Sequence, residues 1–257
     1  MVSMRTFLLG AGLVTIASIT TATTSYAQEQ VQSTSEDNAS NLKWSGRINF
    51  GGLLTDGNTN KKAVSLDGRT SARTKKNRYT VGAEIYYAED EGEETQNEYI
   101  AYGEYDRFVN DKLFYGGRAS YEVDDLADLD YRLKVGPYVG YQFYESEPLN
   151  LSTRLGLDYI KEETEGGDVE ESAAVSWGVD YDQKLIEDTI QVFYKHDTSL
   201  PVDDVEGFLY NGETGVRFPI AKVITGTAQI DFDWDNDPAE GARESDVRYT
   251  LKLGYEF

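Results

Sequence analysis

The chain has 257 residues, of which 46 are Asp or Glu and 24 are Lys or Arg, so its formal net charge is −22 at pH 7. This charge argues against nucleic-acid binding, because the protein would repel phosphate backbones. The absence of cysteine excludes disulfides and thiolate metal sites, and the single histidine excludes a multi-histidine metal centre. Hydrophobic residues make up 39%, too few for a bundle of membrane-spanning helices, while 19 Tyr and 24 Gly beside only 5 Pro favour a folded, β-rich chain.

The N-terminal segment predicts export. Arg5 precedes an apolar stretch over residues 6–22, and the Ser-Tyr-Ala sequence at 25–27 offers small residues at both positions that a signal peptidase reads. A basic start, an apolar core and a small-x-Ala exit are typical of a secretory signal peptide. We therefore predict that residues 1–27 are a signal peptide cleaved before Gln28. A retained anchor helix is the alternative, but the apolar run is short for a full membrane span.

The pattern changes to a period of two near Trp44. Residues 28–42 before it lack periodicity and aromatic residues, so we predict a flexible periplasmic lead-in. From there to the end, apolar and aromatic residues alternate with charged and small ones, as in Tyr115 and Tyr121 against Arg118. Such alternation indicates strands with one apolar face. Because no helical pattern is present to cover these faces, bilayer lipid is their expected cover.

Turn signals divide this region into strands that are longer than those of ordinary soluble proteins. Short connections alternate with mostly longer, acidic ones, as periplasmic turns alternate with outer loops in bacterial barrels. We predict an all-β fold over residues 43–257, a transmembrane antiparallel up-and-down β-barrel with a polar lumen in the outer membrane of a Gram-negative bacterium. The twelve predicted strands are 44–55, 61–74, 78–90, 95–109, 112–125, 129–143, 149–162, 169–185, 189–200, 205–219, 222–235 and 245–257.

Aromatic residues gather near the ends of the predicted strands, where girdles form at the two membrane surfaces. The alternative is a soluble β protein with an aromatic core, which the charged opposite face argues against. The alternating C-terminus with its last residue Phe257 resembles the signal that outer-membrane insertion machinery reads. The predicted girdle residues are Trp44, Tyr79, Tyr115, Phe143, Tyr255 and Phe257 on the periplasmic side and Tyr121, Tyr131 and Trp234 on the outer side.

Several motifs give this region a resemblance to a known family. The opening strand contains Trp44-Ser45-Gly46 and is followed by a Gly-Asn-Thr turn at 57–59, and a later stretch has Arg132 and a Gly-x-x-x-Gly-Tyr pattern at 136–141. Residues 43–257 thus resemble the salt-induced outer-membrane proteins, a family catalogued as a domain of unknown function. The resemblance implies an outer-membrane barrel and supplies no activity. The name of the family suggests an osmotic response.

Alternation also places charges of both signs on the face predicted to line the lumen. A twelve-stranded barrel is narrower than a porin with 16–18 strands. Paired charges either fill and close such a lumen or line a narrow hydrated pore, and both alternatives stay open. The predicted lumen charges are Arg47, Asp67, Arg69, Arg73, Glu84, Glu104, Arg118, Glu122, Arg132, Lys134, Arg154, Asp158, Asp180, Glu213, Arg217, Arg248, Lys252 and Glu256.

Acidic residues are concentrated in the predicted outer loops. Asp231, Asp233 and Asp235 share one strand face and Asp237 follows, which is a hypothesis for a divalent-cation site because hard cations prefer oxygen clusters. The glycine of a calcium loop is missing, and a solvated acidic loop is the alternative. The Asp-Gly-Asn-Thr sequence at 56–59 is interpreted as a hairpin turn. Together the acidic loops predict a negative outer mouth that attracts cations.

His196 carries the one catalytic hypothesis. An outer-membrane hydrolase would use it with Asp203 or Asp204 at the barrel rim. Neighbours on a strand point to opposite faces, so His196 and Asp197 are not expected to pair. We predict a non-enzymatic barrel without cofactors that acts as a narrow, cation-leaning diffusion channel, linked by the resemblance to salt or osmotic stress. The alternatives are a closed structural or loop-binding barrel and a rim-active hydrolase.

Overall fold

The computed structural model describes residues 42–55, 61–127, 129–164, 167, 169–186, 189–203, 207–238 and 243–257. The predicted signal peptide at 1–27, the lead-in up to residue 41 and the predicted turn at 56–59 lie outside the described residues. So does Asp204, one of the two carboxylates considered as a partner of His196. Among the described residues, no helix is long and apolar enough to cross a bilayer.

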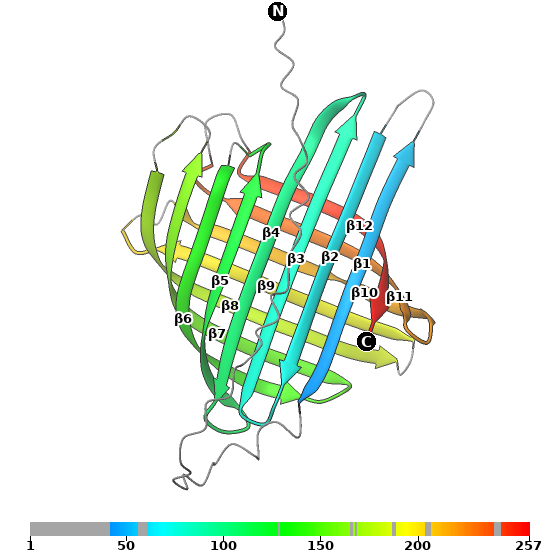
Figure 1. Ribbon diagram of the computed structural model, residues 1–257, viewed down its shortest axis with the longest axis vertical. Helices are drawn as coiled ribbons and strands as arrows, with labels where there is room; N and C mark the ends of the chain where they lie inside the picture. Colours follow the sequence, from blue (N-terminus) through cyan, green and yellow to red (C-terminus); the bar gives the residue numbers. More distant parts are fainter. Residues whose placement is uncertain are drawn as a thin grey trace, which may run out of the picture. The chain divides into compact units, whose positions relative to one another are not determined.

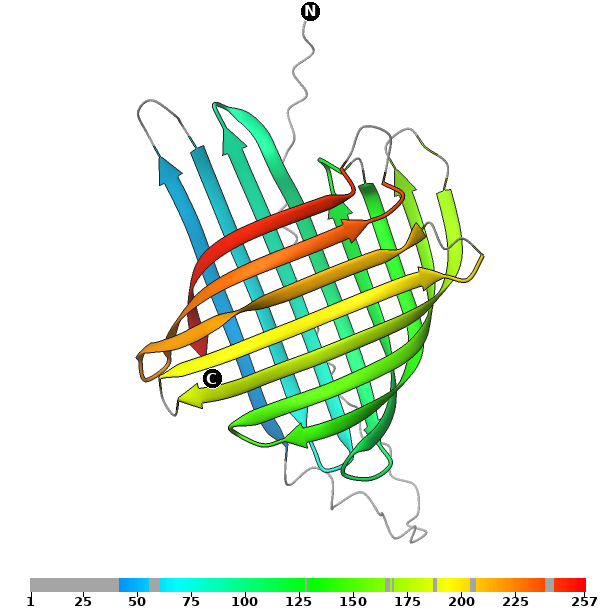
Figure 2. The ribbon, with the colours of Figure 1, turned by 180° about the vertical axis from the view of Figure 1, so that it is seen from behind.

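The described residues form a single closed barrel of antiparallel strands (Figures 1 and 2). Each strand pairs with its neighbours in the sequence, and the last returns to pair with the first. This confirms the predicted all-β, up-and-down barrel. The strands are β1 (Lys43–Thr55), β2 (Lys61–Arg73), β3 (Asn77–Asp90), β4 (Glu93–Phe108), β5 (Leu113–Asp124), β6 (Leu129–Glu145), β7 (Leu149–Thr164), β8 (Val169–Ile186), β9 (Ile190–Pro201), β10 (Leu209–Ala221), β11 (Ile224–Asp235) and β12 (Ser245–Glu256).

The alternation of side chains sets the two faces of the wall. On β12, Tyr249 and Leu253 are exposed on the outside, whereas Lys252 between them is buried on the inside. On β6, Val139 is exposed and Tyr138 is buried. The same alternation runs through the other strands, because successive residues of a strand point to opposite faces. Valine, tyrosine and threonine suit such a pleated surface, which explains why these sequences form strands.

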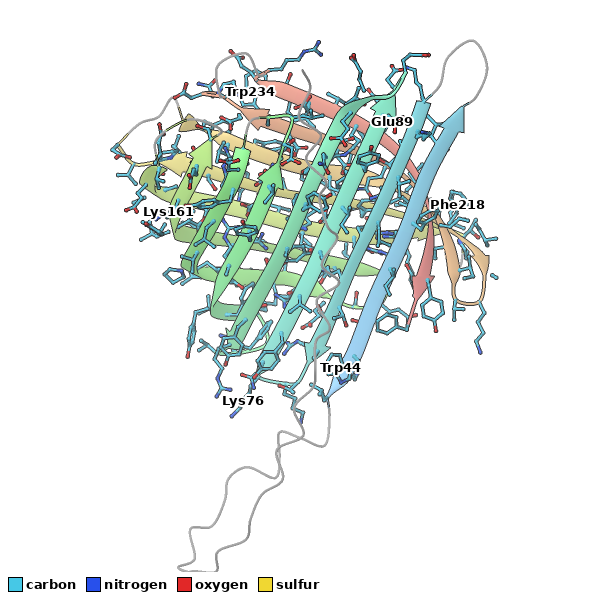
Figure 3. All side chains as sticks on the ribbon, turned by 45° about the horizontal axis from the view of Figure 1, so that its top comes forward. Trp44, Lys76, Glu89, Lys161, Phe218 and Trp234 are labelled. Atoms are coloured by element: carbon cyan, nitrogen blue, oxygen red, sulfur yellow. The ribbon has the colours of Figure 1, made fainter. Side chains whose placement is uncertain are left out.

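The two ends of the barrel are distinguished by where its first and last strand residues lie. Trp44 and Lys76 lie at one end, and Glu89 and Trp234 lie towards the other (Figure 3). Backbone hydrogen bonds from Gly46 to Phe257 and back hold both termini of the barrel at the first end. We call this the terminal end and the opposite one the distal end.

Tight turns close hairpins at both ends. At the terminal end, the side-chain oxygen of Asn110 accepts a hydrogen bond from the Leu113 amide at 2.8 Å. At the distal end, β3 and β4 are joined through Glu91 and Gly92, whose φ angles are 53° and 89°. Two positive φ angles are characteristic of a type I′ hairpin turn. The strands predicted at 78–90 and 95–109 leave a four-residue connection, so the observed two-residue connection is tighter than predicted.

Candidate functional site: a charged lumen

The lumen is crossed by ion pairs between strands that are not neighbours in the wall. Arg69 on β2 meets Asp180 on β8 at 3.0 Å. Arg154 on β7 reaches Glu104 on β4 at 3.2 Å and Asp197 on β9 at 3.0 Å. These pairs join strands that do not touch in the wall, so they can form only through the interior.

A neighbouring cluster is centred on Arg118 of β5. Its guanidinium group is bonded to Asp158 on β7 and to Asp197 on β9. Arg118 and Asp158 are both almost completely buried. A buried charge is tolerated only when it is paired and hydrogen-bonded, and Arg118 fulfils this condition with two carboxylates.

Towards the distal end, two arginines hold the carboxylates of β11. Arg132 contacts Glu162 at 2.5 Å and Asp235 at 2.8 Å. Arg248 contacts Asp231 at 3.5 Å and Asp233 at 3.6 Å. Arg248 also binds Glu98 across the lumen at 2.7 Å.

This arrangement bears on the predicted cation cluster. Asp231, Asp233 and Asp235 do share the lumen face, but each of them faces an arginine. The side chain of Asp235 also accepts a hydrogen bond from the Asp237 amide at 3.1 Å. Within the described part of the chain, no three carboxylate or histidine side chains are grouped to hold a metal ion.

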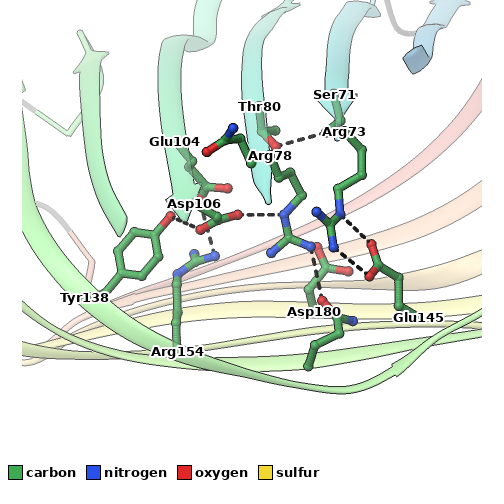
Figure 4. A network of polar contacts seen from close by, with 12 residues as sticks. Ser71, Arg73, Arg78, Thr80, Glu104, Asp106, Tyr138, Glu145, Arg154 and Asp180 are labelled. Atoms are coloured by element: carbon green, nitrogen blue, oxygen red, sulfur yellow. Dashed lines mark hydrogen bonds and ion pairs between the residues drawn. The ribbon is translucent and has the colours of Figure 1, made fainter. Parts of the chain in front are cut away.

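Towards the terminal end, a second polar network lines the lumen (Figure 4). Arg73 forms two hydrogen bonds to Glu145, at 2.9 and 3.0 Å. Arg78 contacts Asp106 at 2.6 Å, and the Tyr138 hydroxyl donates to the same carboxylate at 2.6 Å. These bonds connect β2 and β3 with β4 and β6, so they fix the terminal half of the interior.

The ion pairs separate two larger cavities. The distal cavity has a volume of about 500 Å³, and nine carboxylates and three arginines line it. The terminal cavity has a volume of about 440 Å³, and six carboxylates and five arginines line it. A smaller cavity of about 160 Å³ lies among Lys134, Lys195 and their acidic neighbours. The interior is therefore strongly acidic at its distal end and nearly balanced at its terminal end.

Most predicted lumen charges take part in these contacts. Lys252 binds Asp67 at 2.7 Å, Arg47 meets Glu256 at 3.4 Å, and Arg217 is buried. Several participants are not among the predicted lumen charges, although the period of two marks all of them as inward-facing. These are Arg78, Glu98, Asp106, Asp182, Lys195 and Asp197.

The predicted girdle residues lie on the outward face near the two ends. Trp44 is exposed at the terminal end, and Tyr255 stacks on Phe257 with ring centroids 6.1 Å apart. Near the distal half, Tyr121 stacks on Tyr131 at 6.1 Å. These pairs are aromatic ladders on the wall, of the kind that interfacial belts contain.

His196 lies on the outer wall rather than in the lumen. Its ring is 4.6 Å from that of Trp177 and 5.7 Å from that of Tyr210, and the side chain is only 5% exposed. Neither ring nitrogen has a hydrogen-bond partner among the described residues. Asp197 points into the lumen instead, where Arg118 and Arg154 bind it. Among the described residues, no nucleophile or carboxylate is hydrogen-bonded to His196, and Asp204 lies outside them.

A closed antiparallel barrel with an apolar wall and a charged interior defines a porin-like β-barrel. Residues 48–257 match the family model described as "Protein of unknown function, DUF481". The chain belongs to this family, which confirms the resemblance to a barrel family of unknown function. A comparison with curated proteins finds no match.

Several solved structures resemble this chain at low sequence identity. The NanC porin superposes with a TM-score of 0.50 at 12% identity, covering 84% of this chain and 99% of that one. The KdgM porin gives 0.47 at 11% identity, with 82% and 99% covered. The translocator domain of the autotransporter NalP from Neisseria meningitidis gives 0.46 at 11% identity, with 86% and 90% covered.

Proposed function

We propose that the chain is an outer-membrane diffusion channel that prefers small cations. The apolar outer wall is suited to lipid, and bacterial barrels of this kind have both termini in the periplasm. The terminal end would then face the periplasm and the distal end the outside. In this proposal residues 1–27 are the cleaved signal peptide, and the strand ending in Phe257 is read by the insertion machinery. A link to salt or osmotic stress rests on the family resemblance.

The single observation that carries the cation preference is the charge of the distal cavity. Nine carboxylates against three arginines give its lining an excess of negative charge, whereas the terminal cavity is nearly balanced. A mouth of one sign with low-dielectric walls concentrates ions of the opposite sign. The ion pairs beyond it narrow the path, so we expect a small conductance.

The test is single-channel conductance of the refolded protein in planar bilayers under a salt gradient. We expect unit steps with a reversal potential that shows cation preference. Neutralising Asp237, Glu244 and Asp246 in the distal cavity by D237N, E244Q and D246N should lower the cation-to-anion ratio by about twofold or more. The matched control is Glu171→Gln, because Glu171 is an exposed residue whose carboxylate pairs with Lys161 at 3.4 Å on the outer wall. Anion preference in the unaltered protein, or equal ratios in all variants, would contradict the proposal.

A closed barrel is the second candidate, and the ion pairs that cross the lumen favour it. Arg69, Arg118, Arg154 and Arg248 each connect strands that are not neighbours in the wall. If these bridges close the path, folded protein will be electrically silent. Heat-modifiable mobility in gels would show that the silent protein is folded, and function would then be sought in the distal loops.

A further inference from the structure

The wall of the barrel is not paired along its whole height between β1 and β12. The two strands are in register from Arg47↔Glu256 to Gly51↔Lys252. The same register would place residues 52–55 opposite residues 248–251, but none of these pairs forms. The other edges of both strands stay paired, β1 with β2 up to Thr55 and β12 with β11 up to Ser245. Figures 1 and 2 show β1 and β12 diverging towards the distal end. We call this unpaired part of the seam, between residues 52–55 of β1 and 248–251 of β12, the seam slit.

Side-chain exposure supports the separation of the two strands. Tyr249 and Leu251, on the outward face of β12 beside the slit, are 77% and 76% exposed. Phe50 and Leu253, which are partners just below the slit, are 56% and 58% exposed. These higher exposed fractions occur where the backbone pairing of β12 to β1 has ended.

The slit lies at the depth of the lipid. A strand rises about 3.3 Å per residue and is tilted by about 45° in a membrane barrel, so about 11 residues cross an apolar band of about 25 Å. Residues 52–55 lie about 8 to 11 positions beyond Trp44 at the terminal end. The outward residues of β12 also stay apolar as far as Val247. The slit therefore opens into the outer half of the band.

The slit is continuous with the distal cavity. Arg248, at the distal end of the slit edge of β12, also lines that cavity, together with its neighbours Asp246 and Val247. Inside the wall, the Arg248 guanidinium lies 3.8 Å from the centre of the Tyr86 ring, and Lys252 Nζ is 3.4 Å from the Tyr86 hydroxyl. Unpaired strand edges are tolerated at membrane depth only where they are buried in protein or line a water-filled cavity. The slit edge of β12 has polar side chains, Arg248 and Thr250, on the lumen face and apolar ones, Tyr249 and Leu251, on the outer face.

We propose that the seam slit is a lateral portal through which a cationic single-chain amphiphile moves between the distal cavity and the outer leaflet. The head group stays in the acidic cavity while the alkyl chain passes between β1 and β12 into the lipid. The positive charge expected of the head group is inferred from the carboxylates of the distal cavity, which also support the proposed function. The slit itself does not require that the lumen conduct ions.

The opening to lipid is tested by fluorescence quenching. Because the chain has no cysteine, single-cysteine variants label cleanly. One fluorophore is placed on Thr250→Cys, on the lumen face of β12 beside the slit, and in a second variant on Ser120→Cys. Lipids that carry a spin label on the acyl chain should quench the fluorophore at position 250 at least twofold more strongly than the one at position 120. Ser120 is the matched control because it faces the lumen from the fully paired β5. Equal quenching at the two sites would overturn the portal.

Binding of the cationic amphiphile is tested with variants in which β1 and β12 are cross-linked. G52C with L251C, cross-linked by a short thiol reagent, should close the slit, and F50C with L253C is the matched control in the paired part. Both are refolded in nanodiscs, and folding is checked by heat-modifiable mobility. The control should bind dodecyltrimethylammonium at least tenfold more tightly than tetramethylammonium, after subtraction of empty nanodiscs, and the closed seam should lose this difference.

Two outcomes would overturn the ligand proposal. Equal binding of dodecyltrimethylammonium to both cross-linked variants would show that the slit is not its path. Tighter binding of dodecyl sulfate would show that the head group has the wrong sign. Conductance of the same two variants separates this proposal from the proposed function, because a closed seam should leave cation-selective conductance unchanged. A protein that shows no conductance but binds the amphiphile only when the seam is open would contradict the proposed channel and leave the portal standing.

Discussion

At the scale of single residues, the lumen depends on arginines that each meet more than one carboxylate. Arg118 is buried and bonded to Asp158 and Asp197. A buried ion pair adds little to stability compared with an apolar pair of the same size, but removing one partner leaves an uncompensated charge. The contributions of the paired residues to stability therefore depend strongly on one another. The ion pairs serve to hold the interior in one arrangement.

We expect Asp158→Leu to lower the free energy of unfolding by about 3 kcal/mol, because it removes one of the two carboxylates that Arg118 requires. The double variant Asp158→Leu with Arg118→Met should recover much of this loss, since no buried charge is then left without its partner. The measurement is the urea midpoint of the folded band in gels. Lys62→Ala, on an exposed pair with Glu89, is the control and should leave the midpoint unchanged. A double variant no more stable than the single one would contradict the argument.

The aromatic environment of His196 leads to a second expectation. Both of its ring nitrogens are buried without a hydrogen-bond partner among the described residues, and an apolar ring of similar shape removes that cost. His196→Phe should therefore be as stable as the unaltered protein or more stable by about 1 kcal/mol. His196→Ala should be less stable, because it leaves a hole beside Trp177 and Tyr210.

The same two variants test the hydrolase hypothesis. His196 is the single histidine of the chain. If the purified barrel hydrolyses lipids or peptides, the rate of hydrolysis should be the same in His196→Phe as in the unaltered protein. A loss of hydrolysis in this stable variant would restore the catalytic interpretation.

At the scale of elements, the backbone conformation of the hairpin turns sets how neighbouring strands are joined. The β3–β4 connection uses two residues with positive φ, and a Cβ atom added at Gly92 would meet nothing within 4 Å. Space is therefore not the reason for glycine at this position. The reason is the backbone conformation, which other L-residues adopt only at a cost.

Gly92→Val should accordingly lower the free energy of unfolding by about 1 to 2 kcal/mol, and Gly92→Asn should lower it by less, because asparagine tolerates the left-handed region. Urea midpoints of the refolded variants provide the measurement. If valine and asparagine give the same midpoint, the turn does not have the type I′ conformation in the folded protein.

At the scale of the whole molecule, the barrel is narrow enough for side chains to meet across it. Arg69 and Asp180 are 111 positions apart in the sequence and bond at 3.0 Å. A wider porin would leave such charges separated by water, whereas here they divide the interior into two cavities. The conductance of the barrel, if the path is open, is therefore set by the ion pairs rather than by the wall.

Removing one bridge should widen the path. We expect Arg69→Ser with Asp180→Ser to raise single-channel conductance by about twofold or more, because the long arginine side chain and its ion pair leave the lumen without leaving a net charge. Lys161→Ser with Glu171→Ser removes an ion pair from the outer wall and is the control. Identical conductance of the two double variants would locate the narrowest point elsewhere.

The sequence by itself determined the class of fold and the side to which each residue points. Alternation is a local property, because every strand residue turns its side chain opposite to its neighbour. The twelve strands, the apolar wall and the inward direction of residues such as Arg69 and Arg118 could all be read from the period of two. Strand ends were placed to within a few residues, with β10 beginning at Leu209 rather than near 205.

Only the tertiary structure decided which charges meet and where the wall opens. The partners of Asp231 and Asp235 are arginines on β12 and β6, which curvature and strand tilt bring to one place, so three spaced aspartates belong to two different ion-pair groups. The seam slit depends on the register between the first and the last strand. Neither follows from spacing along the chain, because both arise from contacts between segments that meet only when the barrel closes.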